Sequence, residues 1–174
     1  MYHNYSIAIL GVVYMAEYCQ IKSSSIKILK KEWESFIDEC LDEMNRQYTE
    51  ELVSYGEEAR NDKFHERYEE ESIDEWYSDA VDKLNKWKES LRNKIVDTYR
   101  SGNKIIDEIE NKKFYDNETA YAFELDFCEG EIEKNLSDYI GVYFWGFTWD
   151  IDGVVISFNP SPPEFTEWMP VKYR

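Results

Sequence analysis

The residues best suited to chemistry lie between Tyr55 and Trp76, in the stretch YGEEARNDKFHERYEEESIDEW. This stretch contains His65, one of two histidines in the chain. If residues 57–71 form a helix, His65 shares one stripe with nearby carboxylates, because residues three and four apart are neighbours on a helix surface. The stripe consists of Glu58, Asp62, His65, Glu66 and Glu69. Imidazole and carboxylate groups in this arrangement could hold a divalent cation or assist hydrolysis.

The spacing of these residues argues against a metal site. Helical bundles that hold two metal ions use two Glu-x-x-His repeats and two further glutamates. This chain has a single Asp-x-x-His, formed by Asp62 and His65, and no second copy. The H-E-x-x-H signature fails as well, because Glu69 stands where the second histidine belongs. We therefore expect no metal and no cofactor, with Asp62, His65, Glu66 and Glu69 as the candidate ligands if one is bound.

Other catalytic motifs do not occur in the sequence. We find no nucleophile elbow, no phosphate-binding glycine loop, no dinucleotide fingerprint and no EF-hand loop. Paired carboxylates could act as acid and base, but nothing distinguishes two of the 37 acidic residues. We expect a protein that is not an enzyme. The alternative is a small carboxylate- or metal-dependent hydrolase that uses the stripe at Asp62, His65, Glu66 and Glu69.

Charge is the strongest signal in the sequence. The chain carries 37 acidic and 20 basic residues, for a net charge of −17. Residues 32–79 alone have a net charge of −14, and residues 116–152 have −9. Such a field repels nucleic acids and anionic membranes and attracts basic proteins. We therefore expect neither direct nucleic-acid binding nor a membrane partner.

The helical period positions this charge. Apolar residues recur at helical spacing and predict amphipathic helices over about 25–55, 57–71, 72–101 and 103–114. Ser23–Ser25 supply an N-cap for the first helix, and Gly56 is its stop. Ser72 and Glu75 match a capping box, and Gly102 marks an end. The acidic face predicted to bind a partner comprises Glu58, Asp62, Glu66, Glu69, Glu70 and Asp74.

Alternating residues predict strands in the last third of the chain. We expect an antiparallel meander over about 119–128, 139–149 and 153–159, with a hairpin turn at Asp152-Gly153. Residues 5–20 form either a buried helix or a central strand. The fold class is then α+β, because the helices precede the strands. We expect a single domain over 1–174, with a helical portion at 22–115 and a β portion at 117–174.

Aromatic residues in the predicted strand 139–149 offer a second binding surface. Trp145, Phe147 and Trp149 alternate, so they share one face of a strand. This face is either covered by another element or used to bind a partner. An adaptor or structural protein that binds through the aromatic sheet face is therefore the second alternative.

The cysteines bear on the compartment. Cys19, Cys40 and Cys128 are odd in number and widely spaced, which predicts buried thiols in a reducing cytoplasm. The apolar stretch YSIAILGVVYMAEYCQI is interrupted by Glu17 and Gln20 and suits neither a membrane span nor a signal peptide. The long amphipathic helices would permit a homodimer.

These observations favour an acidic protein that binds and inhibits a basic partner. A nuclease or another nucleic-acid-handling protein fits, because carboxylates could occupy its phosphate-binding groove in place of nucleic acid. A cationic toxin bound by an immunity protein fits equally well. Low glycine and alanine with abundant lysine, isoleucine and asparagine is typical of a phage or a low-GC bacterium, where anti-defence and immunity proteins of this kind occur.

Overall fold

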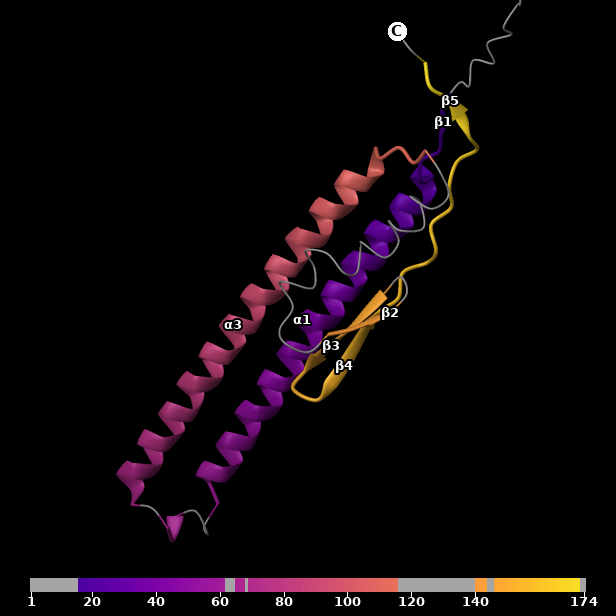
Figure 1. Ribbon diagram of the computed structural model, residues 1–174. Coiled ribbons are helices and arrows are strands. Elements are labelled where there is room, and N and C mark those ends of the chain that lie inside the picture. The colour runs from indigo at the N-terminus through magenta and orange to yellow at the C-terminus, as the bar shows by residue number, and fades with distance from the viewer. Residues whose placement is uncertain (1–15, 62–64, 68, 116–139, 144–145, 173–174) are drawn as a thin grey trace, which may run out of the picture.

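The computed structural model describes residues 16–61, 65–67, 69–115, 140–143 and 146–172. Two long antiparallel helices, α1 (Ser23–Ala59) and α3 (Glu70–Glu110), pack side by side, and a small antiparallel sheet lies against α1 (Figure 1). This arrangement confirms the α+β class. Within the described ranges, no helix combines the length and apolarity needed to cross a membrane.

The predicted apolar stripe of the first helix is the core of the molecule. Seven residues at helical spacing are buried: Ile26, Leu29, Trp33, Phe36, Ile37, Cys40 and Met44. The matching residues of α3 are Leu84, Ile95, Ile106 and Ile109, with Ile73 buried near its first turn. Each helix therefore buries one stripe against its neighbour, as the 3.6-residue period requires.

The predicted cap and the predicted stop of the first helix are wrong. Lys22 stands at the N-cap without a side-chain cap, so Ser23–Ser25 lie inside α1. The hydroxyl of Ser25 instead accepts a hydrogen bond of 2.9 Å from the Glu164 backbone N–H. At the other end, α1 continues through Gly56 to Ala59. Contacts with other parts of the chain therefore outweigh the local capping signals.

The predicted short helix at 57–71 is also wrong. Residues 57–59 belong to α1, and α3 begins at Glu70 with Glu69 at its N-cap. Of the described residues between them, Glu66 and Arg67 lie in a turn, and His65 donates one helical hydrogen bond of 3.2 Å to the Asn61 carbonyl. Ser72 lies within α3, and its backbone N–H bonds the Glu69 carbonyl, so the capping box does not form.

The predicted break at Gly102 is replaced by continuous helix, because α3 runs to Glu110. Gly102 is needed for packing. A methyl group on its Cα would overlap the indole ring of Trp33. Trp33 is fully buried, and its indole N–H lies 3.3 Å from the Tyr99 carbonyl oxygen. The missing side chain at Gly102 therefore creates the space that the largest core residue of α1 fills.

The described meander has strands β2 (Ile140–Tyr143), β3 (Gly146–Ile151) and β4 (Val154–Phe158), in that order. The prediction of one strand over 139–149 is wrong, because β2 and β3 are separate strands that pair antiparallel, with Tyr143 opposite Gly146. The turn at Asp152-Gly153 is confirmed. Both residues have positive φ, 46° and 91°, as a tight hairpin turn requires. The predicted strand 119–128 lies outside the described residues.

The meander is attached to α1 through β4. Ile156 and Phe158 are buried, and the Phe158 ring lies 5.2 Å from Trp33 and 5.4 Å from Phe36, centroid to centroid. The alternate residue Val155 is 57% exposed. β4 therefore shows the alternation of a strand with one buried face.

The N-terminal segment is extended in its described part. β1 (Glu17–Tyr18) pairs with β5 (Met169–Pro170) in a separate two-stranded sheet, and Cys19 bridges Phe114. Residues 16–21 are thus neither a buried helix nor a central strand of the meander, while 5–15 lie outside the described residues. Further bonds join this segment to the chain after β4, including Thr166 N–H to the Gln20 carbonyl at 2.7 Å.

Cys19 and Cys40 are buried free thiols, as predicted, while Cys128 lies outside the described residues. Burial raises the pKa of both thiols. Because the thiolate is the reactive form, a raised pKa lowers reactivity at pH 8. In a Cys128→Ser variant we expect Ellman's reagent to modify neither thiol rapidly in native protein and both at once in guanidinium. Rapid native modification would contradict the buried positions.

Candidate functional site

The closed end of the helical hairpin carries most of the predicted acidic face. The sheet lies against the middle of α1, so the last turns of α1 and the first turns of α3 project beyond it (Figure 1). Six exposed carboxylates gather there, and we call them the acidic tip: Glu57, Glu58, Glu66, Glu69, Asp74 and Glu75. The fold thus brings one end of each helix and the link between them into a single acidic surface.

The residues predicted for the acidic face lie in different elements of this end of the molecule. Glu58 lies in the last turn of α1, Glu66 and Glu69 in the link, and Asp74 near the start of α3; all four are exposed. Glu70 begins α3, but its side chain is not described, and Asp62 lies outside the described residues. The residues share one end of the molecule and not one helix stripe. Glu57 and Glu75, which the prediction omitted, belong to the same surface.

Within the described part of the chain, no ion pair involves a carboxylate of the acidic tip. The described ion pairs lie elsewhere, as in Lys30 with Glu110 at 2.9 Å and Arg46 with Glu50 at 2.6 Å. Burial raises the pKa of Tyr55, near the end of α1, and the charges of Glu51 and Glu58 raise it further. Arg60 and Arg67 are exposed in the same region, but neither enters a described ion pair with these carboxylates.

The metal hypothesis finds no support at the stripe. Among the residues that the structure describes, no three histidine, cysteine, aspartate or glutamate side chains lie close enough to hold an ion. The stripe required a helix over 57–71, which does not form. His65 is exposed at the edge of a depression of about 450 Å³, with Arg60, Asp74 and Tyr77 among its neighbours.

Aromatic contacts hold the projecting half of the hairpin together. Tyr55 of α1 and Trp76 of α3 meet edge to face at 6.0 Å. About two turns nearer the sheet, the Tyr48 hydroxyl hydrogen-bonds Asn85 at 2.8 Å, and the Lys88 ammonium lies 4.2 Å from the Tyr48 ring centroid. These contacts hold the end of α1 against the start of α3, the two segments that carry most of the acidic tip.

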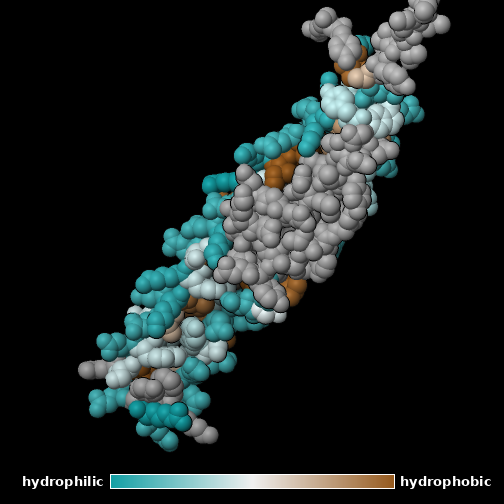
Figure 2. All heavy atoms as spheres, viewed as in Figure 1, coloured by the Kyte–Doolittle hydropathy of each residue, from teal (hydrophilic) through white to brown (hydrophobic). Residues whose placement is uncertain are grey.

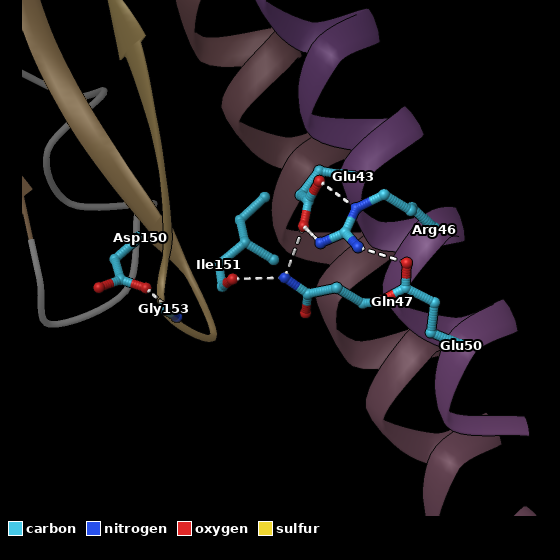
Figure 3. A network of polar contacts seen from close by, with 7 residues as sticks. All are labelled: Glu43, Arg46, Gln47, Glu50, Asp150, Ile151 and Gly153. Carbon is cyan, nitrogen blue, oxygen red and sulfur yellow. Dashed lines mark hydrogen bonds and ion pairs between the residues drawn. The ribbon is translucent and has the colours of Figure 1, made fainter. Parts of the chain in front are cut away.

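A second feature lies where the β3–β4 turn meets α1. The Gln47 amide donates to the Ile151 carbonyl at 2.6 Å and to Glu43 at 2.8 Å (Figure 3). Arg46 binds Glu43 on one side and Glu50 on the other, and hydrogen bonds from Arg46 lower the pKa of Glu43. Within the turn, Asp150 accepts a bond of 2.6 Å from the Gly153 N–H. The turn is therefore fixed to the helix.

The fixed turn closes one side of a groove between the two helices, with a volume of about 560 Å³. We call it the turn groove. Its walls come from the two helices and the β3–β4 hairpin: Arg46, Gln47, Glu50, Glu51 and Tyr55 of α1, Lys83, Leu84 and Trp87 of α3, Asp152 of the turn and Val154 at the start of β4. The sequence predicted the turn but not the groove, because nothing local indicates that Gln47 donates a hydrogen bond to a carbonyl 104 positions away.

The predicted aromatic face is described only in part. Phe147 and Trp149 lie in β3, at register positions opposite Val142 and Ile140 of β2. Trp145 lies outside the described residues. Because β2 and β3 are separate strands, the alternation through 139–149 does not belong to one continuous strand. Whether these aromatic residues bind a partner stays a prediction.

The fold and the surface together define a helical-hairpin protein of the α+β class with an acidic closed end. Hydrophilic residues dominate the visible face of the hairpin (Figure 2). No protein-family model matches the sequence, and neither a curated protein nor a solved structure matches the chain.

Proposed function

We propose that the protein is a non-enzymatic inhibitor that binds a basic protein through the acidic tip. One observation carries the proposal: exposed carboxylates from two helices and their link share one end of the molecule, where no described ion pair neutralises them. Charges of the same sign repel one another within a Debye length of about 8–10 Å, and this repulsion lowers the stability of the folded protein. Binding of a basic partner would relieve this repulsion, and the opposite charges would raise the rate of association.

The partner's chemistry follows from the charge. Lysine and arginine side chains that bind phosphates would bind clustered carboxylates in the same way. A nuclease or other nucleic-acid-handling protein therefore suits the acidic tip, with the carboxylates taking the place of a nucleic acid. A cationic toxin suits it as well. The setting we propose is phage anti-defence or toxin immunity in a bacterial cytoplasm.

Charge reversal tests the acidic tip. In a variant with Glu58, Glu66, Glu69 and Asp74 all changed to lysine, we expect binding to a basic partner captured from bacterial lysate to weaken at least tenfold, or about 1.4 kcal/mol. Binding of the unaltered protein should weaken by a similar factor when salt rises from about 50 to 300 mM, because exposed charges are screened. Calorimetry measures both, and the partner's activity reports inhibition.

The matched control reverses four exposed acidic residues away from the tip: Glu39, Asp42, Glu89 and Glu108. It changes the net charge equally, so it separates the surface from overall charge. Circular dichroism checks that both variants fold. Equal losses in the two variants would reject a localised surface. Binding that ignores both salt and the tip would favour an adaptor that uses an apolar face.

A further inference from the structure

We infer that the turn groove anchors a lysine or arginine side chain of the basic partner. The aliphatic stem would lie on Trp87 and Leu84, and the charged head would meet Glu51 and Asp152. This inference rests on the proposed function and extends its binding surface from the acidic tip along α1. It identifies the occupant by its chemistry, a long cationic side chain on a partner segment.

The shape of the turn groove suits such a side chain. Its volume of about 560 Å³ lies within the range of about 300–1,000 Å³ that is usual for ligand sites. Leu84 is buried at its floor, and Trp87 and Tyr55 are half-buried. Lysine and arginine stems pack on apolar surface while their heads stay in water, and an aromatic ring attracts the cation. The floor thus offers a place for the stem.

The charges on the walls favour a cation. Arg46 is already engaged, with its guanidinium 2.6 Å from Glu50 and 2.9 Å from Glu43. The exposed carboxylates of Glu51 and Asp152 enter none of the described ion pairs. Asp152 is held in place, because the turn is bonded to Gln47 through the neighbouring Ile151 carbonyl. Two exposed carboxylates, one of them on a turn that is bonded to α1, therefore lie beside the apolar residues of the groove.

The turn groove is continuous with the acidic tip. Glu51 and Glu58 are seven residues apart on α1, which is about 10 Å along a helix. One basic segment could therefore place one side chain in the groove and others at the tip. Lys83, also on the wall, opposes a cationic occupant and would attract an anionic one. Its effect on binding therefore distinguishes the sign of the occupant.

The test uses three end-blocked peptides in calorimetry: repeats of Arg-Leu-Gly, of Arg-Ser-Gly and of Glu-Leu-Gly, all of equal length. We expect both arginine peptides to bind more tightly than Glu-Leu-Gly. Trp87→Ala should weaken both arginine peptides at least tenfold, because they share the arginine stem that would lie on Trp87; a loss confined to Arg-Leu-Gly would assign the contact to leucine and reject the arginine stem as occupant. Asparagine tolerates the positive φ of this turn position, so Asp152→Asn removes only the charge, and it should also weaken binding of Arg-Leu-Gly. Lys83→Glu should strengthen it severalfold.

Each contrary result has a distinct meaning. If Lys83→Glu weakens Arg-Leu-Gly, or if Glu-Leu-Gly binds as tightly, the cationic occupant is rejected. If Trp87→Ala and Asp152→Asn both leave Arg-Leu-Gly unchanged in folded protein, the groove is not used. If the tip reversal still weakens Arg-Ser-Gly, the proposed function survives that failure. If the tip reversal leaves Arg-Ser-Gly unchanged, the proposed function fails by itself.

Discussion

Replacing Gly102 with alanine is expected to destabilise the protein by about 2–3 kcal/mol, the scale of overpacking in a well-packed core. The added methyl group would overlap the Trp33 indole, which is fully buried and cannot move aside into solvent. Alanine is the better helix former by about 1 kcal/mol, so helix propensity alone predicts the opposite sign. Guanidinium unfolding followed by far-ultraviolet circular dichroism measures the difference.

Gly56 provides the matched control, because it also lies inside a long helix. A methyl group there would meet no atom within 4 Å. Gly56→Ala is therefore expected to stabilise the protein by about 0.5–1 kcal/mol. The two substitutions are chemically identical and should have opposite signs. Stabilisation by both would show that Trp33 does not lie over Gly102.

Replacing Phe158 with alanine is expected to cost about 3–5 kcal/mol, as for other buried phenylalanines. Phe158 is 2% exposed and contacts both Trp33 and Phe36 of α1. The substitution would leave a cavity beneath the sheet and remove the main contact between β4 and the helix. Unfolding experiments give the cost, and hydrogen exchange of the β3 and β4 amides should accelerate.

Val155 on the same strand is the control, because it is 57% exposed. Val155→Ala should change the stability by no more than about 0.5 kcal/mol, as is usual for surface substitutions. A small effect of Phe158→Ala, comparable to that of Val155→Ala, would mean that the sheet does not contribute to the core.

Long-period signals in the sequence predicted the fold class, while short signals failed at the ends of elements. The stripe from Ile26 to Met44 was recognised because many residues share one period. Gly102 resembled a helix end, and Ser72 resembled the start of a capping box. Both signals describe local preferences of about 1 kcal/mol, which packing between distant residues can outweigh. The turn at Asp152-Gly153 succeeded because its conformation depends on those two residues alone.

The candidate site, too, could be predicted only in part. The acidic tip could be predicted as a charged surface, since the charge is a property of the residues themselves. Its grouping could not, because the link between the helices interrupts the expected stripe of Glu58 and Glu66. The turn groove depends on a hydrogen bond between Gln47 and Ile151, far apart in sequence. A contact of that kind leaves no periodic pattern in either segment.

The pairing of β1 with β5 has a practical consequence for measuring binding. The Val171 N–H bonds the Ala16 carbonyl at 2.8 Å, so two segments far apart in the sequence meet at one end of the described structure. The 37 residues of α1 separate that pole from the closed end of the hairpin by about 55 Å. A tether attached beside the β1–β5 pair would therefore hold the protein on a sensor surface by the end opposite the acidic tip. Immobilised in this way, the molecule would expose the carboxylates of the acidic tip to the solution.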